Sequence, residues 1–448
     1  MFRSFGDFTS SRARMPKPML AVAEPLESRA MLAGDDHGHA GDLHVHVEDN
    51  KLSTDHGAYG WEFVDEGGGF VADIGFDAED LPADSSLRLM PKTNLLYWNG
   101  VGPAANFMLA AGTTSLTLEG TEDEINLGAI AGLGDFLTIA AEEQGSVHEH
   151  IAAAIGSAPR GVYAFYASVT SSDEGIGGSK PIAFVLNRGM SERIHDRAIA
   201  ALEDRPIVVS AVTSTANGTL KAGQTIDIAV TYSEAVIVRG RPEIVLDVGG
   251  ASRAARHVAY DAETMTSTFR YTVSAQDPVD ADGIGVGRML RLALGSSIRA
   301  AEGNATALRV IPRVDGSGIL IDTSIPRLTR IEATVQSTTY TAGQTLEFLV
   351  RFSKPVIVTG TPSLRFVTGG NVRFAGDSVY VSGSNSRELT FRYTVQPTDA
   401  ARGGVSLRRA FALLGNSTVR DSLGNAAVFG AGIFAFPDVK VRPAPVVS

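Results

Sequence analysis

One stretch of this sequence occurs almost twice, and the repeat limits what the chain can fold into. Residues 221–238 read KAGQTIDIAVTYSEAVIV, and residues 341–358 read TAGQTLEFLVRFSKPVIV. The 120-residue offset is kept by further pairs: Pro206 and Pro326, Gly223 and Gly343, Ser233 and Ser353, Pro242 and Pro362, Gly249-Gly250 and Gly369-Gly370. A period this long gives each copy enough chain to bury its own core. We therefore expect two tandem domains, over residues 206–325 and 326–443, that each fold alone.

Apolar and polar residues alternate inside both copies. In the first copy Ile226, Ile228, Val230 and Tyr232 are separated by polar or small residues, and in the second Leu346, Phe348, Val350 and Phe352 follow the same rule. This alternation is typical of a strand with one buried and one wet face. Glycine and proline separate the candidate strands, and neither copy has a helical stripe. The fold class predicted is all-β, with each copy an antiparallel two-sheet sandwich.

The order of short motifs in each copy carries a resemblance. AGQT, a Tyr/Phe-Ser-x-x-Val-Ile-Val segment, Gly-x-Pro, Gly-Gly and FRYTV follow one another in both. This order resembles the immunoglobulin-like or cadherin-like repeat of large bacterial surface proteins. The resemblance implies an extracellular spacer or adhesive module without catalysis. The junction at residues 321–326 is similar to that family too, and Pro326 would stiffen it because proline fixes φ.

Acidic loops in the copies raise the question of calcium. Asp277, Asp280 and Asp282 could offer oxygens to a hard cation, which needs six to eight of them. The second copy keeps one carboxylate there, Asp399, and Asp421 of the second copy has alanine as its counterpart. A calcium site shared by the repeats is therefore not expected, and ordinary turn chemistry is the favoured interpretation.

The N-terminus reads as a targeting segment over residues 1–36. The octet LESRAMLA at residues 26–33 resembles the Leu-Glu-x-Arg-x-Leu-Leu-Ser/Ala motif of many planctomycete exported proteins, although Met31 departs from the usual leucine. The resemblance implies export to the cell surface or the extracellular space. A disordered tail with no targeting role is the alternative. No run of 18 apolar residues is present, so no membrane-spanning segment is predicted.

Composition excludes several kinds of function. The chain has no cysteine, which rules out thiolate metal sites, catalytic thiols and disulfides. Its 39 basic and 50 acidic residues give a net charge of −11, which argues against a nucleic-acid partner.

Histidines are concentrated in residues 37–190, which we expect to form an N-terminal β-sandwich-like domain. Seven of the nine histidines lie there, and three pairs have the spacing His-x-His. On a strand this spacing puts both imidazoles on one face, where they can hold one metal ion. The predicted zinc ligands are His44, His46, His148 and His150. The alternative is a set of exposed histidines without a metal, and for His37 and His39 a mobile linker is favoured.

A second resemblance concerns residues 147–169, VHEHIAAAIGSAPRGVYAFYASV. The pattern looks like the His-x-His and Ala-Pro-Gly-x-Tyr segments of small β-rich domains in bacterial surface-anchored proteins, some of which are associated with zinc supply. Those domains begin with another His-bearing strand, which His44 and His46 could match. A bulky aromatic residue that often follows the second histidine there is missing in this sequence.

Between the N-terminal domain and the repeats, residues 191–205 predict a short helix and linker. Ser191 is a candidate N-cap, Ile194, Ala198, Ile199 and Leu202 would face inward, and His195 would lie on the surface.

The N-terminal domain contains both tryptophans of the chain. Trp61 and Trp98 are either core residues, which we favour, or a platform for stacking a sugar. Residues 444–448 form a tail.

No catalytic signature is present: the sequence lacks Gly-x-Ser-x-Gly, His-Glu-x-x-His and a phosphate-binding loop. The favoured function is therefore a non-enzymatic exported structural or adhesion protein, whose partner is a protein or polysaccharide at the cell surface. Zinc binding through the His-x-His pairs is the alternative, and a carbohydrate-active enzyme is the second alternative. No cofactor is firmly indicated beyond a possible zinc ion.

Overall fold

The structure is a computed structural model and describes residues 42–443 except 79, 83–84, 105, 121–122, 129–134, 140–145, 304, 336–337 and 414–415. The targeting segment, His37, His39 and the tail at residues 444–448 lie outside the described residues. The predicted all-β class is confirmed, because α1 (Glu192–Leu202) is the only helix of the described part of the chain.

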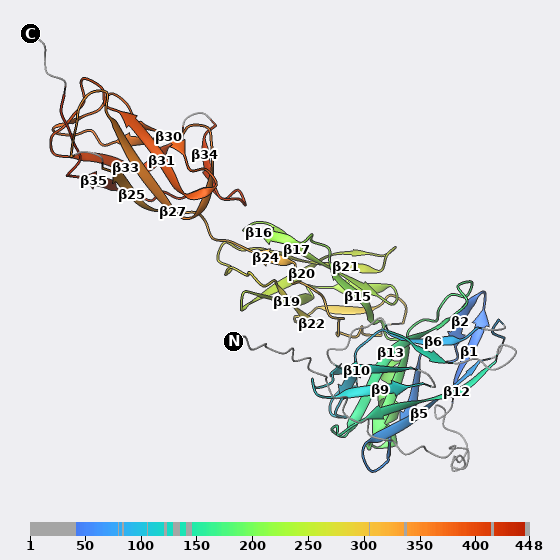
Figure 1. Cartoon of the computed structure of the whole chain (residues 1–448). Helices are drawn as coiled ribbons and strands as arrows, with labels where there is room; N and C mark the ends of the chain where they lie inside the picture. Colours follow the sequence, from blue (N-terminus) through green and yellow to red (C-terminus); the bar gives the residue numbers. More distant parts are fainter. Residues whose placement is uncertain are drawn as a thin grey trace, which may run out of the picture. The chain divides into compact units, whose positions relative to one another are not determined.

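Two sheets of seven strands each form the N-terminal domain (Figure 1). The first sheet has the order β10 (Glu124–Gly128), β9 (Ser115–Glu119), β12 (Val147–Ile155), β5 (Phe70–Ala78), β1 (Leu43–Glu48) and β2 (Lys51–Thr54), with β4 (Val64–Asp65) also on β5. The second has the order β11 (Leu137–Ile139), β6 (Leu87–Pro91), β13 (Gly161–Ser171), β14 (Ile182–Arg188) and β3 (Ala58–Glu62), with β7 (Leu96–Trp98) on β13 and β8 (Met108–Leu109) on β7.

Aromatic side chains from both sheets meet in the core between them. The ring of Phe184 in β14 stacks on Phe165 at 4.8 Å and on Trp61 at 5.4 Å, and it also meets Phe76 of β5 at 6.3 Å. Trp61 and Trp98 are 8% and 3% exposed. Both tryptophans are therefore core residues, as favoured from the sequence, and their rings are not available as a sugar platform.

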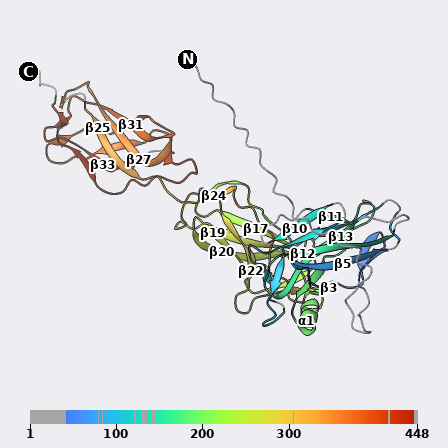
Figure 2. The same cartoon turned by 60° about the horizontal axis from the view of Figure 1, so that its bottom comes forward.

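The helix α1 packs on β3 and β14, on the side of that sheet away from the first sheet (Figure 2). This second layer explains why β13 and β14 are buried along nearly their whole length rather than at every second residue. Ala198, Ile199 and Leu202 point inward as predicted.

Two details of α1 differ from the sequence-based expectation. Ser191 begins the helix through its carbonyl oxygen, which accepts from the Ile194 N–H, and its side chain forms no capping bond. His195 is buried, not on the surface: its Nδ1 lies 3.1 Å from Glu62 Oε1 and its Nε2 lies 3.2 Å from the Val185 carbonyl oxygen. Burial of this polar ring is possible because both nitrogens have partners.

The first repeat, residues 206–325, is built on a six-stranded sheet and two small two-stranded sheets. The large sheet has the order β15 (Val208–Thr213), β17 (Thr225–Tyr232), β21 (Thr266–Thr272), β20 (Ala251–Asp261), β19 (Glu243–Val248) and β22 (Gly285–Arg291). The small sheets pair β16 (Gly218–Leu220) in parallel with β24 (Ile319–Ile321), and β18 (Val236–Arg239) with β23 (Ser297–Ala300).

The second repeat, residues 326–443, is built on an eight-stranded and a four-stranded sheet. The larger has the order β25 (Leu328–Thr334), β27 (Thr345–Thr359), β31 (Ser386–Thr394), β30 (Ser378–Ser382), β28 (Ser363–Phe366), β33 (Val405–Ala412) and β35 (Ile433–Phe436), with β34 (Thr418–Arg420) also on β27. The smaller has the order β26 (Thr339–Tyr340), β36 (Lys440–Val441), β32 (Ala400–Ala401) and β29 (Val372–Arg373), in which β26 and β36 are parallel.

The alternation seen in the sequence sets the inner face of each repeat. Every second residue of β17, from Ile226 to Tyr232, is at most 1% exposed, and the same positions of β27, from Leu346 to Phe352, are at most 4% exposed. Each repeat has its own cluster of buried apolar side chains. Two separate cores are what a duplicated sandwich requires.

Candidate metal site

The first sheet of the N-terminal domain carries a row of histidines and carboxylates on its outer face. Strand β5 lies between β12 and β1, and Asp77 of β5 is opposite both His148 of β12 and His44 of β1. Residues opposite each other in neighbouring strands project to the same face. The neighbouring Val147 and Leu43 are buried, so this row faces solvent.

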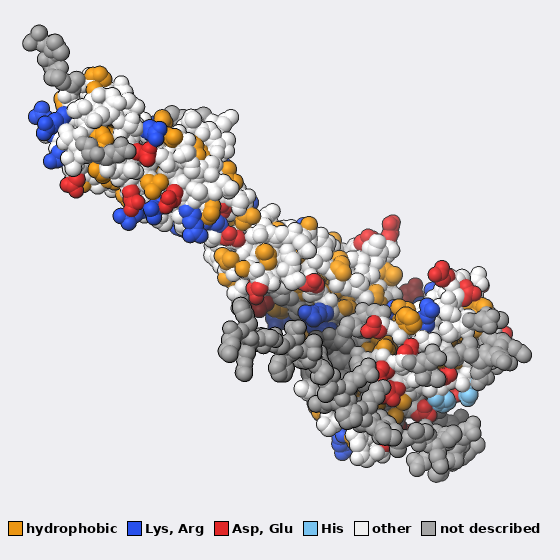
Figure 3. Space-filling model, in the orientation of Figure 1, with side chains coloured by type: hydrophobic (Ala, Val, Ile, Leu, Met, Phe, Trp, Pro, Cys, Tyr) orange, Lys and Arg blue, Asp and Glu red, His pale blue; other side chains and the backbone are white. Residues whose placement is uncertain are grey.

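A second row lies next to the first and completes the site. His150 is opposite Gly75 of β5, and Asp42 comes directly before β1. The candidate ligand atoms of Asp42, His148 and His150 all lie within 4.8 Å of one another. We call these three residues the metal-site group. Figure 3 shows histidine side chains beside acidic ones on this domain.

Gly75 is what allows Asp42 to reach His150 across β5. A Cβ at position 75 would lie 1.9 Å from Asp42 Oδ1 and 3.1 Å from His150 Cε1. Any side chain there would occupy the space in which the carboxylate and the imidazole converge. The close approach of Asp42 and His150 therefore depends on the glycine in β5, the strand between them.

The histidines of the metal-site group are oriented for metal binding. His150 Nδ1 lies 3.1 Å from Asp73 Oδ2, and its Nε2 faces Asp42 Oδ1 at 3.9 Å. A carboxylate on one ring nitrogen fixes which nitrogen is left for a metal. His148 forms no hydrogen bond or ion pair within the described residues, and its ring lies 5.7 Å from that of His150. Two imidazoles and one carboxylate form a ligand set that suits zinc and related divalent ions.

The other two predicted ligands lie with carboxylates of their own. His44 Nδ1 is 3.2 Å from Asp77 Oδ2, and His46 Nε2 is 2.9 Å from Asp55 Oδ1. The structure thus brings His148 and His150 together with Asp42 and does not bring all four histidines together. Asp42 was not among the ligands predicted from the sequence. Its spacing from His44 and His46 could have indicated it, because residues at alternate positions of a strand share one face.

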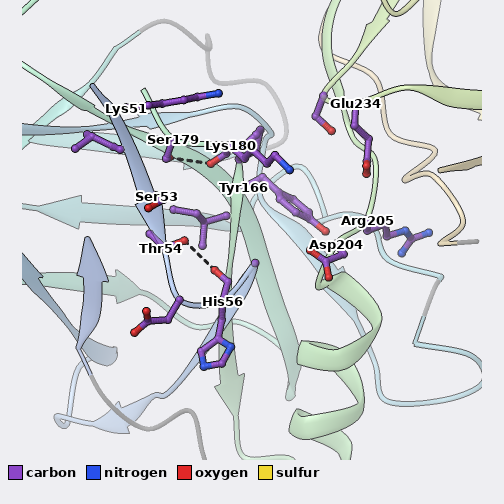
Figure 4. Close-up of a pocket in the computed structure, with 16 residues that line it drawn as sticks. Lys51, Ser53, Thr54, His56, Tyr166, Ser179, Lys180, Asp204, Arg205 and Glu234 are labelled. Carbon is purple, nitrogen blue, oxygen red and sulfur yellow. Dashed lines mark hydrogen bonds between the residues drawn. The ribbon is translucent and has the colours of Figure 1, made fainter. Parts of the chain in front are cut away.

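The described structure also contains a cavity of about 390 Å³ at the end of α1 (Figure 4). Its lining mixes cations and anions, including Lys51, Lys180, Arg205, Asp204 and Glu234. Burial, together with nearby Asp204 and Glu302, raises the pKa of Glu234, and Lys180 opposes this. The Tyr166 hydroxyl in the wall already donates to the Leu202 carbonyl oxygen at 2.6 Å. The mixed charge selects no single ligand class.

The carboxylates in the acidic loop of the first repeat accept hydrogen bonds from protein groups. In the first repeat Asp277 accepts from the Arg253 Nε–H, the Tyr271 hydroxyl and the Ser274 N–H at 2.6 to 2.7 Å. Asp280 accepts from the N–H groups of Gly249 and Gly283. These carboxylates hold turns together, which is the turn chemistry favoured from the sequence.

No protein-family model matches this sequence, and no curated protein matches it either. Similar solved structures include three that each cover more than 80% of the chain. The FN1-FN3 domains of chicken CNTN1 are 11% identical, with 81% of this chain and 100% of that chain covered and a TM-score of 0.20.

A DUF4785 family protein from Legionella pneumophila is 8% identical, with 82% of this chain and 86% of that chain covered and a TM-score of 0.18. A protein from Corynebacterium diphtheriae, described as membrane anchored, is 10% identical, with coverages of 86% and 91% and a TM-score of 0.16. These low scores add nothing to the fold described above. Within the described residues, no helix has both the length and the apolar character needed to cross a bilayer.

Proposed function

We propose that this chain is a non-catalytic exported surface protein whose N-terminal β domain binds a divalent transition metal, in the first place zinc, through Asp42, His148 and His150. The observation that carries the metal proposal is the convergence of these three side chains within 4.8 Å over Gly75. Metal ligands must be deprotonated or neutral, and a carboxylate with two imidazoles meets this condition near neutral pH. Open coordination positions would be filled by water or by the ligand of a partner.

In this proposal the two repeats serve as modules that carry the N-terminal domain or attach to a protein or polysaccharide at the cell surface. Each repeat has its own apolar core, and the carboxylate of Asp277 in the acidic loop of the first repeat is satisfied by protein donors. Such modules need only rigidity, which separate cores supply. The resemblance of their motifs to surface repeats points to the same use.

Zinc titration of the chelator-treated full chain tests the metal proposal. We expect about one zinc ion per chain, and we expect His148→Ala, His150→Ala or Asp42→Ala each to weaken binding by about tenfold or more, because each removes one of three protein ligands. Gly75→Ala should also weaken binding while leaving every ligand in place, because its Cβ would displace Asp42. Circular dichroism of each variant checks that the fold is kept.

The double variant His44→Ala, His46→Ala separates two ligand sets. If Asp42, His148 and His150 hold the ion, this variant titrates almost as the parent chain does. A complete loss of binding would instead favour the four-histidine set predicted from the sequence. An unchanged titration in Asp42→Ala, His148→Ala and His150→Ala together would end the metal proposal.

Cell fractionation tests export. Full-length protein found in the cytosol with its first 33 residues intact would contradict the surface role. Glycosidase and hydrolase screens test the non-catalytic role, and we expect them to return no activity. A reproducible hydrolysis lost in a single-residue variant would replace this proposal with the enzyme alternative.

A further inference from the structure

Charge is divided unevenly among the domains. Residues 37–190 contain 22 Asp and Glu against six Lys and Arg, whereas residues 326–443 contain seven Asp and Glu against 14 Lys and Arg. The first repeat is nearly balanced, with 12 acidic and 11 basic residues over 206–325. A chain with oppositely charged ends has a built-in complementarity toward other copies of itself.

Part of the positive excess lies on one face of the small sheet in the second repeat. Strands β32 and β36 are antiparallel through the buried pair Ala401 and Val441. Arg402 and Lys440 flank this pair on one side, and Arg442 flanks it on the other, in register with Ala400 and with Arg373 of β29. All four cations are exposed. We call Arg373, Arg402, Lys440 and Arg442 the basic face.

The basic face lacks internal counter-charges. Some other cations of this repeat are paired, such as Arg351 with Glu332 and Glu388, and Arg392 with Glu347. None of the four residues of the basic face forms an ion pair within the described residues. Like charges directly across two strands destabilise a sheet. An anionic surface that covers the basic face would relieve this repulsion and lower the free energy of the protein. Figure 3 shows Lys and Arg side chains near the end of the described chain.

The N-terminal domain has the matching arrangement of opposite sign. Glu119 of β9 and Glu124 of β10 are directly opposite each other, and β10 is the edge strand of its sheet. Neither carboxylate forms an ion pair within the described residues. This acidic pair lies on the same sheet as the metal-site group, and its strand β9 pairs directly with β12, where Glu119 is opposite Ala152, two residues from His150.

We propose that the basic face of one copy binds the acidic N-terminal domain of a second copy at the Glu119 and Glu124 edge, in a head-to-tail association. The two surfaces are different, so the contact is heterologous and each bound copy still offers one free end. Chains of copies then grow by the same contact. Attraction between exposed charges is screened by salt, so the association is strongest at low ionic strength.

Sedimentation velocity of the full chain in EDTA tests this proposal independently of the metal. At about 10 mM ionic strength, where the screening length is about 30 Å, we expect mass to rise with concentration, and at about 1 M, where it is about 3 Å, we expect monomer. Arg402→Glu with Lys440→Glu, or Glu119→Lys with Glu124→Lys, should each lower the association constant about tenfold or more. Arg239→Glu with Arg241→Glu makes the same change in net charge as Arg402→Glu with Lys440→Glu, at exposed sites of the first repeat, and should associate like the parent chain.

Mixing the two defective variants is the decisive step. Each keeps one intact surface that complements the other, so the mixture should form complexes that neither variant forms alone. A parent chain that stays monomeric at low salt, or a mixture that fails to associate, would overturn the proposal. Binding of an anionic polysaccharide such as dextran sulfate to the basic face without self-association would also overturn it, since the occupant would then be a polyanion.

Discussion

The two repeats share the order of six strands in their large sheets but fill their cores with different side chains. At equivalent positions Ile228 of the first repeat becomes Phe348 of the second, and Leu246 becomes Phe366. Phe269 is kept as Phe391, and both are fully buried. The first core is mainly aliphatic, and the second is rich in stacked and edge-on rings. Duplication therefore preserved which positions face inward, while the shapes that fill the interior diverged.

The largest expected effect comes from emptying the aromatic core. Phe348→Ala removes a ring that contacts Phe366 and Phe436, and we expect it to destabilise the second repeat by about 3–5 kcal/mol. Ile228→Ala leaves a smaller cavity and should cost the first repeat nearer the lower end of about 2–5 kcal/mol. Hydrogen exchange of the full chain measures both, repeat by repeat. Equal loss of protection in both repeats from either variant would show that the cores are coupled.

A second difference is a reversal of charge at one pair of equivalent positions, of which the one in the second repeat contacts the linker before Pro326. Lys354 of the second repeat replaces Glu234 of the first. Its Nζ lies 2.7 Å from Asp322 Oδ2 and 3.2 Å from Asp421 Oδ2, and it also contacts Ser324. Burial alone would lower the pKa of Lys354, but its bonds to the two carboxylates outweigh this and raise it. The ammonium group thus holds the linker before Pro326 against the second repeat.

Removal of this cation is expected to have an intermediate effect. Lys354→Met removes the cation shared by two carboxylates, one of them buried, which then keep only donors from Ser324, Leu423 and Asn425, and it should cost about 1–3 kcal/mol at neutral pH. Burial alone would raise the pKa values of Asp322 and Asp421, but hydrogen bonds, including those from Lys354, outweigh it and lower them. Their stabilising contribution is therefore present above about pH 4 and is lost as pH falls through the folded-state values.

Urea unfolding at several pH values measures the free energy of unfolding of the parent chain and of Lys354→Met. The difference between the parent chain and Lys354→Met should be largest near neutral pH and should shrink once the aspartates are protonated. Glu234→Gln is the matched variant in the first repeat and should change little, because the side chain is only half-buried there. A cost of Lys354→Met that is independent of pH would point to lost packing rather than lost charge.

The smallest effect is expected where the repeats are most alike. Asp277 bonds to Tyr271 in the first repeat, and Asp399 bonds to Tyr393 in the second, so the pair of a buried aspartate and a tyrosine is kept. The first repeat adds Arg253, half-buried, on Asp277. Burial would raise the pKa of Asp277, but bonds from Tyr271, Arg253 and Ser274 N–H lower it overall.

We expect Arg253→Ala to weaken the first repeat less than Lys354→Met weakens the second, because Arg253 pairs with one carboxylate whereas Lys354 pairs with two. The acid midpoint of unfolding of the first repeat should move slightly toward neutral pH, since the carboxylate is then protonated more readily. Acid titration followed by hydrogen exchange in β21 provides the measurement. A larger loss than in Lys354→Met would show that the arginine, not the tyrosine, holds this loop.

How far the sequence predicts the structure depends on the range of the interactions involved. The inner faces of β17 and β27 follow from alternation alone, because side-chain direction along a strand is local. The surface position predicted for His195 is wrong because its burial depends on packing of the helix against Glu62, which is remote in sequence, and against Val185 of the preceding strand. A helix pattern with one polar ring does not reveal that acceptors on two neighbouring strands satisfy it.

The candidate site shows the same limit. The His-x-His spacing correctly puts His148 and His150 on one face, since that again is local geometry. That Asp42 joins them depends on the order β12, β5, β1 and on a glycine at position 75 of the middle strand. Neither the neighbour relations of strands nor the need for that empty position can be read from spacing within one segment.

The parallel pairs β16 with β24 and β26 with β36 have a mechanical consequence. In each repeat they join a strand near the start of the domain to one near its end. When the two ends of a repeat are pulled apart, parallel neighbours slide along each other, and their hydrogen bonds are loaded together in shear. Bonds loaded together resist force better than bonds opened one after another, so each repeat is constructed to bear tension along the chain.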